Sequence, residues 1–153
     1  LGDPQARGII FGLTLDTDFD SLCRLYWRAC VGIAMGVRHI MEALGGADFG
    51  DGTLAIAGGH VHNPLLMELY ADATGCTIIE PLAGDATLLG GAMLAATAAG
   101  LHPGLADAAA AMQQGGRRHA PDPAGRARCE RDYAIFRALL RQRAEIDAMV
   151  AGS

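Results

Sequence analysis

The fold is decided by the stretch Thr53–Gly75, which has the sequence TLAIAGGHVHNPLLMELYADATG. Its first five residues form a short apolar run that predicts a buried strand. The glycine pair at 58 and 59 follows and turns the chain, since glycine adopts backbone conformations that other residues avoid. Asn63 and Pro64 then predict a helix start, with Asn as the cap and Pro at the first helical position. The stretch is therefore a strand, a tight turn and a helix that ends at Gly75.

The chain downstream continues this alternation. Residues 77–80 form a second apolar run closed by a proline, and they predict another strand. Residues 85–100 and 103–112 predict two helices, the first capped by an aspartate. Residues 113–125 contain Gly, Pro and Arg and predict a surface linker. Residues 126–149 show helical spacing of apolar positions and predict a last helix.

The chain upstream predicts one more strand and one long helix. Ile9, Ile10, Phe11 and Leu13 form an apolar run that predicts a buried strand. Asp18 or Asp20 then caps a long helix that ends near residues 45–46, where two glycines supply the stop. Strands that alternate with helices predict an α/β fold, helix-rich, with a short mainly parallel sheet and helices on its faces.

Composition excludes several classes of protein. The chain has 153 residues, a net charge of −5 and a pI of about 5.4, which argues against nucleic-acid binding. All 12 basic residues are Arg, so a P-loop or a Schiff-base mechanism has no lysine to use. The apolar runs are far shorter than the about 18 residues of a membrane span. The four cysteines form no CxxC pair, and we expect reduced thiols in a cytoplasmic protein.

The glycine turn is the sharpest candidate for a binding site. Ligands of α/β sheets bind at the carboxyl ends of strands, next to helix N-termini. Gly58 and Gly59 would let a ligand approach the backbone, and Asn63 offers an amide donor and acceptor to the edge of a base. The alternative is a tight turn in which Asn63 acts only as a helix cap. Spacing alone favours that alternative.

Two further features of the sequence have plainer explanations than a binding site. The helix within Leu82–Ala96 is made almost entirely of small residues and could pack closely on the sheet or on the glycine turn. His60 and His62 lie two positions apart, but a metal site needs converging ligands, and the sequence shows no such cluster. We therefore expect generic close packing in the first case and loop histidines without a metal in the second.

These residues resemble the FGGY family of carbohydrate kinases, which belongs to the superfamily of actin, Hsp70 and hexokinase. Gly58-Gly59-x-x-x-Asn63-Pro64 is similar to the adenosine segment of that family. The run from Asp85 through Gly90-Gly91-Ala92 resembles its small-residue helix. Downstream, Asp132-Tyr133-Ala134-Ile135-Phe136 resembles the closing helix of its ribulokinase-like members. The resemblance covers nearly the whole chain in the right order.

The resemblance implies a partial actin-like ATPase (ribonuclease H-like) domain, the C-terminal, nucleotide-side part of a kinase. Family members transfer the γ-phosphoryl group of ATP to a sugar hydroxyl with Mg²⁺, in a cleft between two domains. It implies a pentulose such as ribulose as substrate, and Gly58, Gly59 and Asn63 as the adenosine wall. Residues 1–115 would be the kinase domain, and 116–153 a linker and a helix packed on it.

The resemblance also implies what this chain lacks. No catalytic base is matched, and the ligands of Mg²⁺ would lie outside it, on a missing N-terminal domain. Asp51-Gly52-Thr53 looks like a phosphate-binding turn, but it follows the long helix, and we interpret it as a loop. We therefore expect the chain alone to be inactive as a kinase.

Two other readings stay open at this point. The chain could be a non-catalytic actin-like module that binds a nucleotide or a partner protein, and its exposed faces would allow a homodimer. Tyr26 and Trp27 point in different directions on a helix, so we expect one in the core and the other against a partner surface, whichever interpretation holds. A Rossmann-like domain is a weaker alternative, because no G-x-G-x-x-G follows a first strand.

Overall fold

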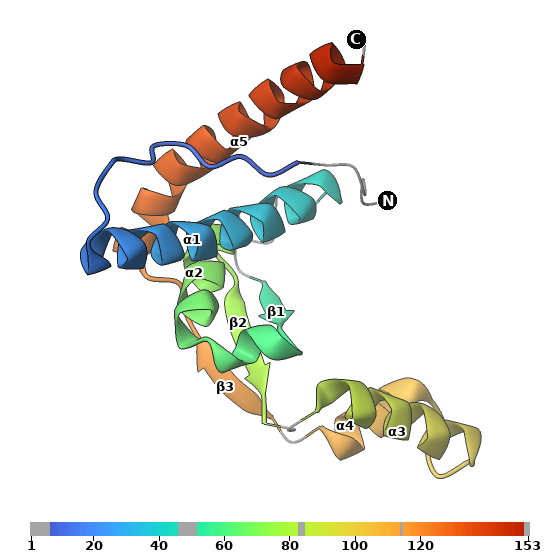
Figure 1. Ribbon diagram of the computed structural model, residues 1–153. Helices are drawn as coiled ribbons and strands as arrows, with labels where there is room; N and C mark the ends of the chain where they lie inside the picture. Colours follow the sequence, from blue (N-terminus) through green and yellow to red (C-terminus); the bar gives the residue numbers. More distant parts are fainter. Residues whose placement is uncertain (1–6, 46–51, 83–84, 114, 152–153) are drawn as a thin grey trace.

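The computed structural model describes residues 7–45, 52–82, 85–113 and 115–151 (Figure 1). In chain order the elements are α1 (Phe19–Ala43), β1 (Thr53–Ala55), the short 3₁₀ helix η2 (Gly59–His62), α2 (Pro64–Thr74), β2 (Thr77–Pro81), α3 (Ala86–Ala98), α4 (Leu105–Met112), β3 (Gly116–His119) and α5 (Pro123–Ala151). The predicted end of the long helix included Gly46, and the predicted loop after it began at Asp51. Both residues lie outside the described residues.

Helix ends follow the local chemistry of the sequence. The Asp18 carboxylate accepts a hydrogen bond from the Ser21 N–H at 2.7 Å and so caps α1. The Asp85 carboxylate accepts from two backbone N–H groups at the start of α3, as predicted. Gly75 ends α2 in the left-handed conformation, with φ of 75°. These caps confirm where the three helices begin or end.

The sheet is small and mixed, with strand order β1-β2-β3. β1 and β2 pair in parallel, so that Leu54 lies opposite Ile78, and this parallel pair was predicted. β3 pairs antiparallel with β2, and it lies where a linker was predicted, which was wrong. Its sequence GRRH has no apolar alternation to signal a strand. The strand is instead held by its neighbour, since the Glu80 carboxylate lies 3.1 Å from His119 Nε2 and 3.6 Å from an Arg117 nitrogen.

The predicted first strand, Ile9–Leu13, is not a strand in the structure. Residues 7–14 have no regular secondary structure, and the side chains of Phe11 and Leu13 are 78% and 67% exposed. Figure 1 shows this segment running between α1 and α5, away from the sheet. A strand needs a hydrogen-bonding neighbour, and the described part of the chain places none beside this segment. The segment has the apolar pattern of a strand, but no strand among the described residues pairs with it.

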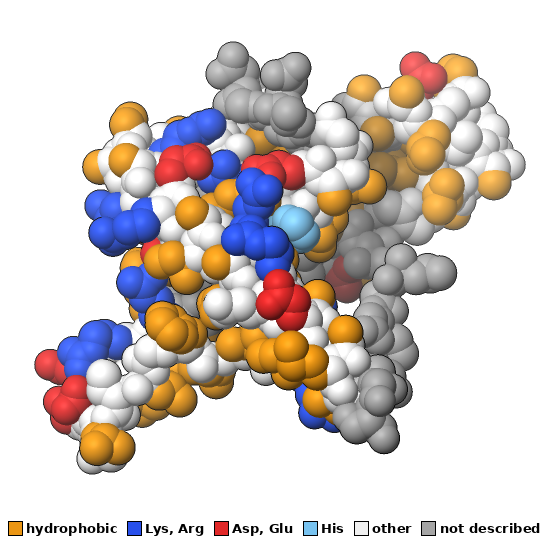
Figure 2. All heavy atoms as spheres, turned by 90° about the horizontal axis from the view of Figure 1, so that it is seen from above, with side chains coloured by type: hydrophobic (Ala, Val, Ile, Leu, Met, Phe, Trp, Pro, Cys, Tyr) orange, Lys and Arg blue, Asp and Glu red, His pale blue; other side chains and the backbone are white. Residues whose placement is uncertain are grey.

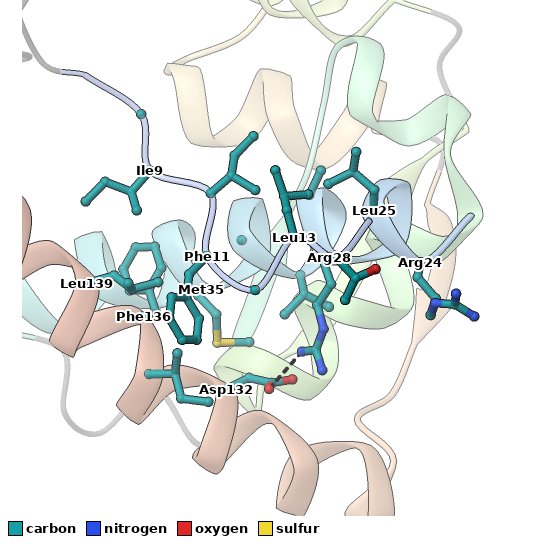
Figure 3. A pocket seen from close by; sticks show the side chains of 18 of the residues that line it. Ile9, Phe11, Leu13, Arg24, Leu25, Arg28, Met35, Asp132, Phe136 and Leu139 are labelled. Carbon is teal, nitrogen blue, oxygen red and sulfur yellow. Dashed lines mark hydrogen bonds and ion pairs between the residues drawn. The ribbon is translucent and has the colours of Figure 1, made fainter. Parts of the chain in front are cut away.

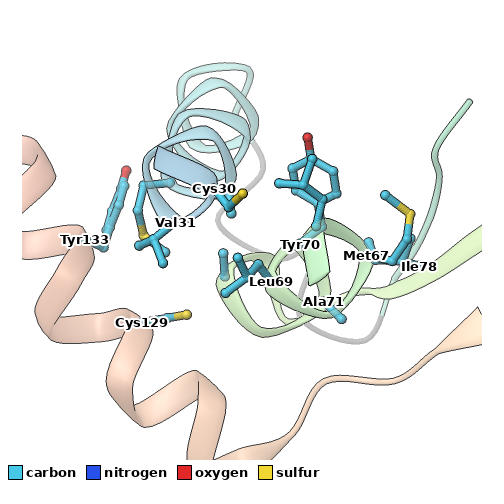
Figure 4. Close-up of a cluster of buried hydrophobic side chains, with 13 residues drawn as sticks. Cys30, Val31, Met67, Leu69, Tyr70, Ala71, Ile78, Cys129 and Tyr133 are labelled. Carbon is cyan, nitrogen blue, oxygen red and sulfur yellow. The ribbon is translucent and has the colours of Figure 1, made fainter. Parts of the chain in front are cut away.

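The core surrounds α2 (Figure 4). Tyr70 and Met67 of α2 are among the largest fully buried side chains, together with Met35 of α1 and Ile78 of β2. The apolar faces of α1 and α5 pack around them, and Cys129 contributes from α5. Burying these side chains is the main driving force for holding the three helices and the sheet together.

A polar network joins α1 to α5 beside this core. The Arg38 guanidinium makes two hydrogen bonds to the Glu130 carboxylate, at 2.8 and 3.1 Å, and lies 4.1 Å from the centre of the Tyr133 ring. The Tyr133 hydroxyl donates to Glu42 at 2.6 Å. This hydrogen bond is the main cause that lowers the pKa of Glu42. Burial, and then the hydrogen bond to Glu42, raise the pKa of Tyr133 to about 12.

The small-residue helix α3 does not pack as expected. It packs against α4, and Figure 1 shows the pair standing away from the sheet and from the glycine turn. None of the residues of α3 is buried, and Leu88 and Leu94 are 73% and 60% exposed. Its apolar residues are spread around the helix rather than gathered on one side. The sequence therefore gives α3 no single face with which to cover the sheet.

Candidate functional site

The turn between β1 and α2 has one backbone position that only glycine fits. Gly58 has φ of 85° and ψ of −162°, a region essentially closed to residues with a Cβ. Its carbonyl accepts from the Val61 N–H at 3.2 Å, which starts the turn of 3₁₀ helix. The Asn63 N–H then donates to the His60 carbonyl at 3.1 Å, and α2 begins at the next residue. The predicted strand–turn–helix is confirmed.

The outer side of this turn is open. Gly58 and Gly59 are exposed, and a Cβ added at either would meet no atom within 4 Å. Gly59 does not have a positive φ, so nothing in the described structure requires a glycine there. A missing side chain at such a position leaves room for another molecule to reach the backbone.

Asn63 occupies the N-cap position of α2, as predicted, but its side chain makes no capping hydrogen bond. Its Nδ2 donates instead to the hydroxyl of Tyr26 on α1 at 2.8 Å, and the Sγ of Cys30 lies 4.0 Å from the same nitrogen. Asn63 is half-buried between the turn and α1. No signal in the sequence points to this contact, because 37 positions separate the two residues.

Tyr70 fastens the turn to the core. Its side chain is buried in α2, and its hydroxyl lies 2.7 Å from Nδ1 of the exposed His60. Burial raises the pKa of Tyr70, so the hydroxyl keeps its proton at neutral pH. The turn is thus anchored on one side by Tyr70 and on the other by Tyr26.

No three His, Cys, Asp or Glu side chains converge into a metal site among the described residues. The turn offers backbone amides, one side-chain amide and imidazoles. Mg²⁺ prefers carboxylate, phosphate and water oxygens, which this turn does not supply. The turn itself therefore does not fit a site for Mg²⁺.

A second feature is an apolar groove of about 1450 Å³ between the segment 7–14, α1 and α5 (Figure 3). Figure 3 places Phe11, Met35, Phe136 and Leu139 along it. The Arg28 guanidinium closes one wall through a 2.9 Å ion pair with Asp132. Figure 2, which views the molecule from above relative to Figure 1, shows hydrophobic side chains exposed between charged ones. Apolar side chains make up most of the groove's lining, and it has the character of a packing surface.

The architecture is that of solved sugar kinases with the actin-like ATPase fold. The structure of ligand-bound xylulose kinase from Lactobacillus acidophilus matches 91% of this chain with a TM-score of 0.75, at 19% identity. Xylulose kinase from Rhodospirillum rubrum matches 94% of it with a TM-score of 0.72, at 25% identity. The chain covers 28% and 29% of those two chains. The predicted partial actin-like domain is confirmed.

The sequence comparisons then give the family. The sequence profile of the C-terminal domain of the FGGY family of carbohydrate kinases matches residues 1–99, and the chain belongs to this family. An FGGY carbohydrate kinase domain-containing protein of Xenopus laevis is 31% identical over 98% of the chain. A ribulokinase of Mycolicibacterium smegmatis is 39% identical over 76% of it. A glycerol kinase of Pseudomonas entomophila is 37% identical over 67% of it.

The chain is short beside these relatives. It spans about a quarter or less of the length of the curated relatives that it matches, with 27% of the Xenopus laevis protein and 20% of the Mycolicibacterium smegmatis ribulokinase covered. Among the described residues, no helix is both long and apolar enough to cross a membrane.

Proposed function

We propose that this chain is the nucleotide-binding C-terminal part of an ATP-dependent kinase that phosphorylates a pentulose such as ribulose. In this proposal, Gly58, Gly59 and Asn63 form the wall that holds adenosine. The observation that carries it is the open outer side of the glycine turn, where the backbone is exposed and no side chain blocks the approach. The family and the ribulokinase and xylulose kinase relatives support the reaction class.

The residues of the turn would hold the nucleoside in place and would form no covalent bond with it. Gly59 leaves space for the flat face of a nucleoside against the backbone, and Asn63 presents an amide to the edge of its base. The groups that neutralise phosphate charge are a separate requirement of phosphoryl transfer. ATP bound here with Mg²⁺ held by the rest of the enzyme would supply the phosphoryl group.

The apolar groove supports a second part of this proposal. The longer relatives have further sequence that this chain does not cover, and we propose that such a domain packs on α1 and on the segment 7–14. It would carry the sugar site, the phosphate-binding turns and the catalytic base. The packing of α5 on α1 and α2 supports placing residues 116–153 in the same domain as residues 1–115.

The test is Asn63→Ala in the enzyme expressed from its complete reading frame, assayed with D-ribulose, L-ribulose, D-xylulose and glycerol. We expect the KM for ATP to rise about tenfold, which corresponds to the loss of one polar contact, while the KM for the sugar stays unchanged. Gln142→Ala is the matched control, since it removes an exposed side-chain amide on α5.

Two outcomes would contradict the proposal. An ATP KM within twofold of wild type would remove Asn63 from the nucleotide site. ATP binding without phosphorylation of any of the four substrates would favour the non-catalytic, nucleotide-binding module.

A further inference from the structure

The helix α3 has the composition of a buried helix, although none of its residues is buried. From residue 86 to residue 106 the chain contains no Asp, Glu, Lys or Arg. Apolar side chains lie all around α3, and Leu88 and Leu94 are 73% and 60% exposed. A helix that is apolar on every side is typical of a protein interior. The described residues therefore leave α3 without the surroundings that its sequence requires.

The helix α4 covers only one side of α3. Among the residues of α3 and α4, all of which the structure describes, Ala108 alone is buried. The pair is joined to the sheet beside the end of β2 and the start of β3, where the Leu82 N–H donates to the Gly115 carbonyl at 3.3 Å. Short helices draw most of their stability from packing, and packing stabilises in proportion to the apolar area removed from water. Another apolar surface against α3 would supply the stabilisation that α4 does not.

The chemistry of α3 defines what can cover it. A helix without charged side chains offers no ion pair to an acidic or a basic surface. A lipid bilayer does not fit either, because the 13 residues of α3 extend about 20 Å and the hydrocarbon core is about 30 Å thick. A helix that lies on a membrane surface needs a charged or polar face, which α3 lacks. The surface that fits α3 is an apolar protein surface.

We infer that α3 is a docking surface for further sequence of the same polypeptide, which covers it with apolar side chains. The inference rests on the proposed function, in which this chain is part of a longer kinase. The family profile matches residues 1–99, which include α3, and the chain spans 27% of the Xenopus laevis relative. A longer relative can therefore cover this helix with its own chain and needs no second copy to do so.

This contact is separate from the one proposed at the apolar groove. In Figure 1, β1 and α2 lie between α1 and the pair of α3 and α4. The glycine turn joins β1 to α2, so the groove and α3 lie on either side of it. Further sequence that makes both contacts would hold α3 in a fixed place relative to the proposed nucleotide site.

The first test is hydrogen exchange in the enzyme expressed from its complete reading frame, without nucleotide or sugar. The amides of residues 90–98, within α3, should exchange at rates within about tenfold of those of α2, which carries the buried Tyr70 and Met67. Exchange of α3 that is faster than this would show an uncovered helix and would overturn the inference.

The second test is Leu94→Asp in the same complete enzyme. We expect its Tm to fall by about 5 °C or more, because the substitution would place a charge in an apolar contact. Ile146→Asp is the matched control, since Ile146 is 54% exposed and lies on α5, outside the residues that the family profile matches. Its Tm should change by about 1 °C or less. Equal losses in the two variants would contradict the inference.

Sedimentation and activity separate the remaining outcomes. If Leu94→Asp converts a wild-type dimer into a stable monomer, a second copy covers α3 and the inference fails. An uncovered α3 in an enzyme that phosphorylates a pentulose would overturn the inference and leave the proposed function standing. A covered α3 in an enzyme that phosphorylates no sugar would support the docking surface and overturn the proposed function.

Discussion

Gly58 and Gly59 have the same side chain but different roles in the turn. Gly58 has φ of 85°, so Gly58→Ala should cost about 1–3 kcal/mol of unfolding free energy through backbone strain. Gly59 lacks a positive φ and has free space around it, so Gly59→Ala should cost almost nothing. Urea unfolding of the complete enzyme checks both values. If the two variants lose stability equally, the backbone description of the turn is wrong.

The same pair shows what a sequence can reveal at this scale. The prediction of a glycine turn before Asn63 was confirmed, because Gly-Gly and Asn-Pro are local signals of backbone conformation. Which glycine is strained, and where the Asn63 side chain points, could not be predicted. The direction of the Asn63 side chain depends on α1, which contacts it only after the chain has folded. The adenosine wall itself stays a prediction.

At the scale of elements, the contact between α1 and α5 predicts that the stability of the fold depends on pH. The Tyr133 hydroxyl donates to Glu42 and lowers the pKa of that carboxyl from its usual 4.5. A lowered pKa stabilises the fold above pH 4.5, and this contribution is lost as the pH falls through the folded-state value. Tyr133→Phe should cost about 0.5–1.5 kcal/mol at pH 7, because solvent partly screens the exposed Glu42 carboxylate, and the difference from wild type should shrink toward pH 3.

The stability that the same contact contributes should also depend on pH in the alkaline range. Burial and Glu42 raise the pKa of Tyr133 to about 12 from 10.0, so its contribution is complete below pH 10 and is lost as the pH approaches 12. Urea unfolding at pH 3, 7 and 11 measures both the acid and the alkaline change in the free energy of unfolding. Tyr26→Phe serves as the comparison, since its hydroxyl bonds a neutral amide and should show no acid-side change. A pH-independent cost of Tyr133→Phe would contradict the pairing with Glu42.

Elements with a strong local pattern were predicted, and those defined by their neighbours were not. The long amphipathic helix α1 and the capped helix α2 follow from periodicity and end signals. β3 has the polar sequence GRRH and becomes a strand because β2 provides the pairing edge. Gly116 fits there because an added Cβ would meet the Ile79 side chain and the Glu80 backbone. A strand that forms because a neighbouring strand pairs with it need not show a periodic apolar pattern in its own sequence.

At the scale of the whole molecule, the exposed apolar side chains of residues 10–13 bear on the proposed further domain. Ile10, Phe11 and Leu13 are 67–78% exposed on one side of the groove, although their pattern is typical of a buried strand. Burying such side chains would stabilise the protein by about 25 cal/mol for each Å² of apolar surface removed from water. We expect the further domain of the complete enzyme to supply a neighbouring strand to residues 9–13.

Hydrogen exchange tests this expectation directly. In the complete enzyme, the amides of residues 9–13 should be protected, because strand pairing removes them from water. In the 153-residue chain they should exchange within seconds, while the amides of α2, which carries the buried Tyr70 and Met67, stay protected. Phe11→Ser should destabilise the complete enzyme and reduce self-association of the shorter chain. Equal exchange of residues 9–13 in both proteins would show that the segment remains unpaired, and the groove would then need another occupant.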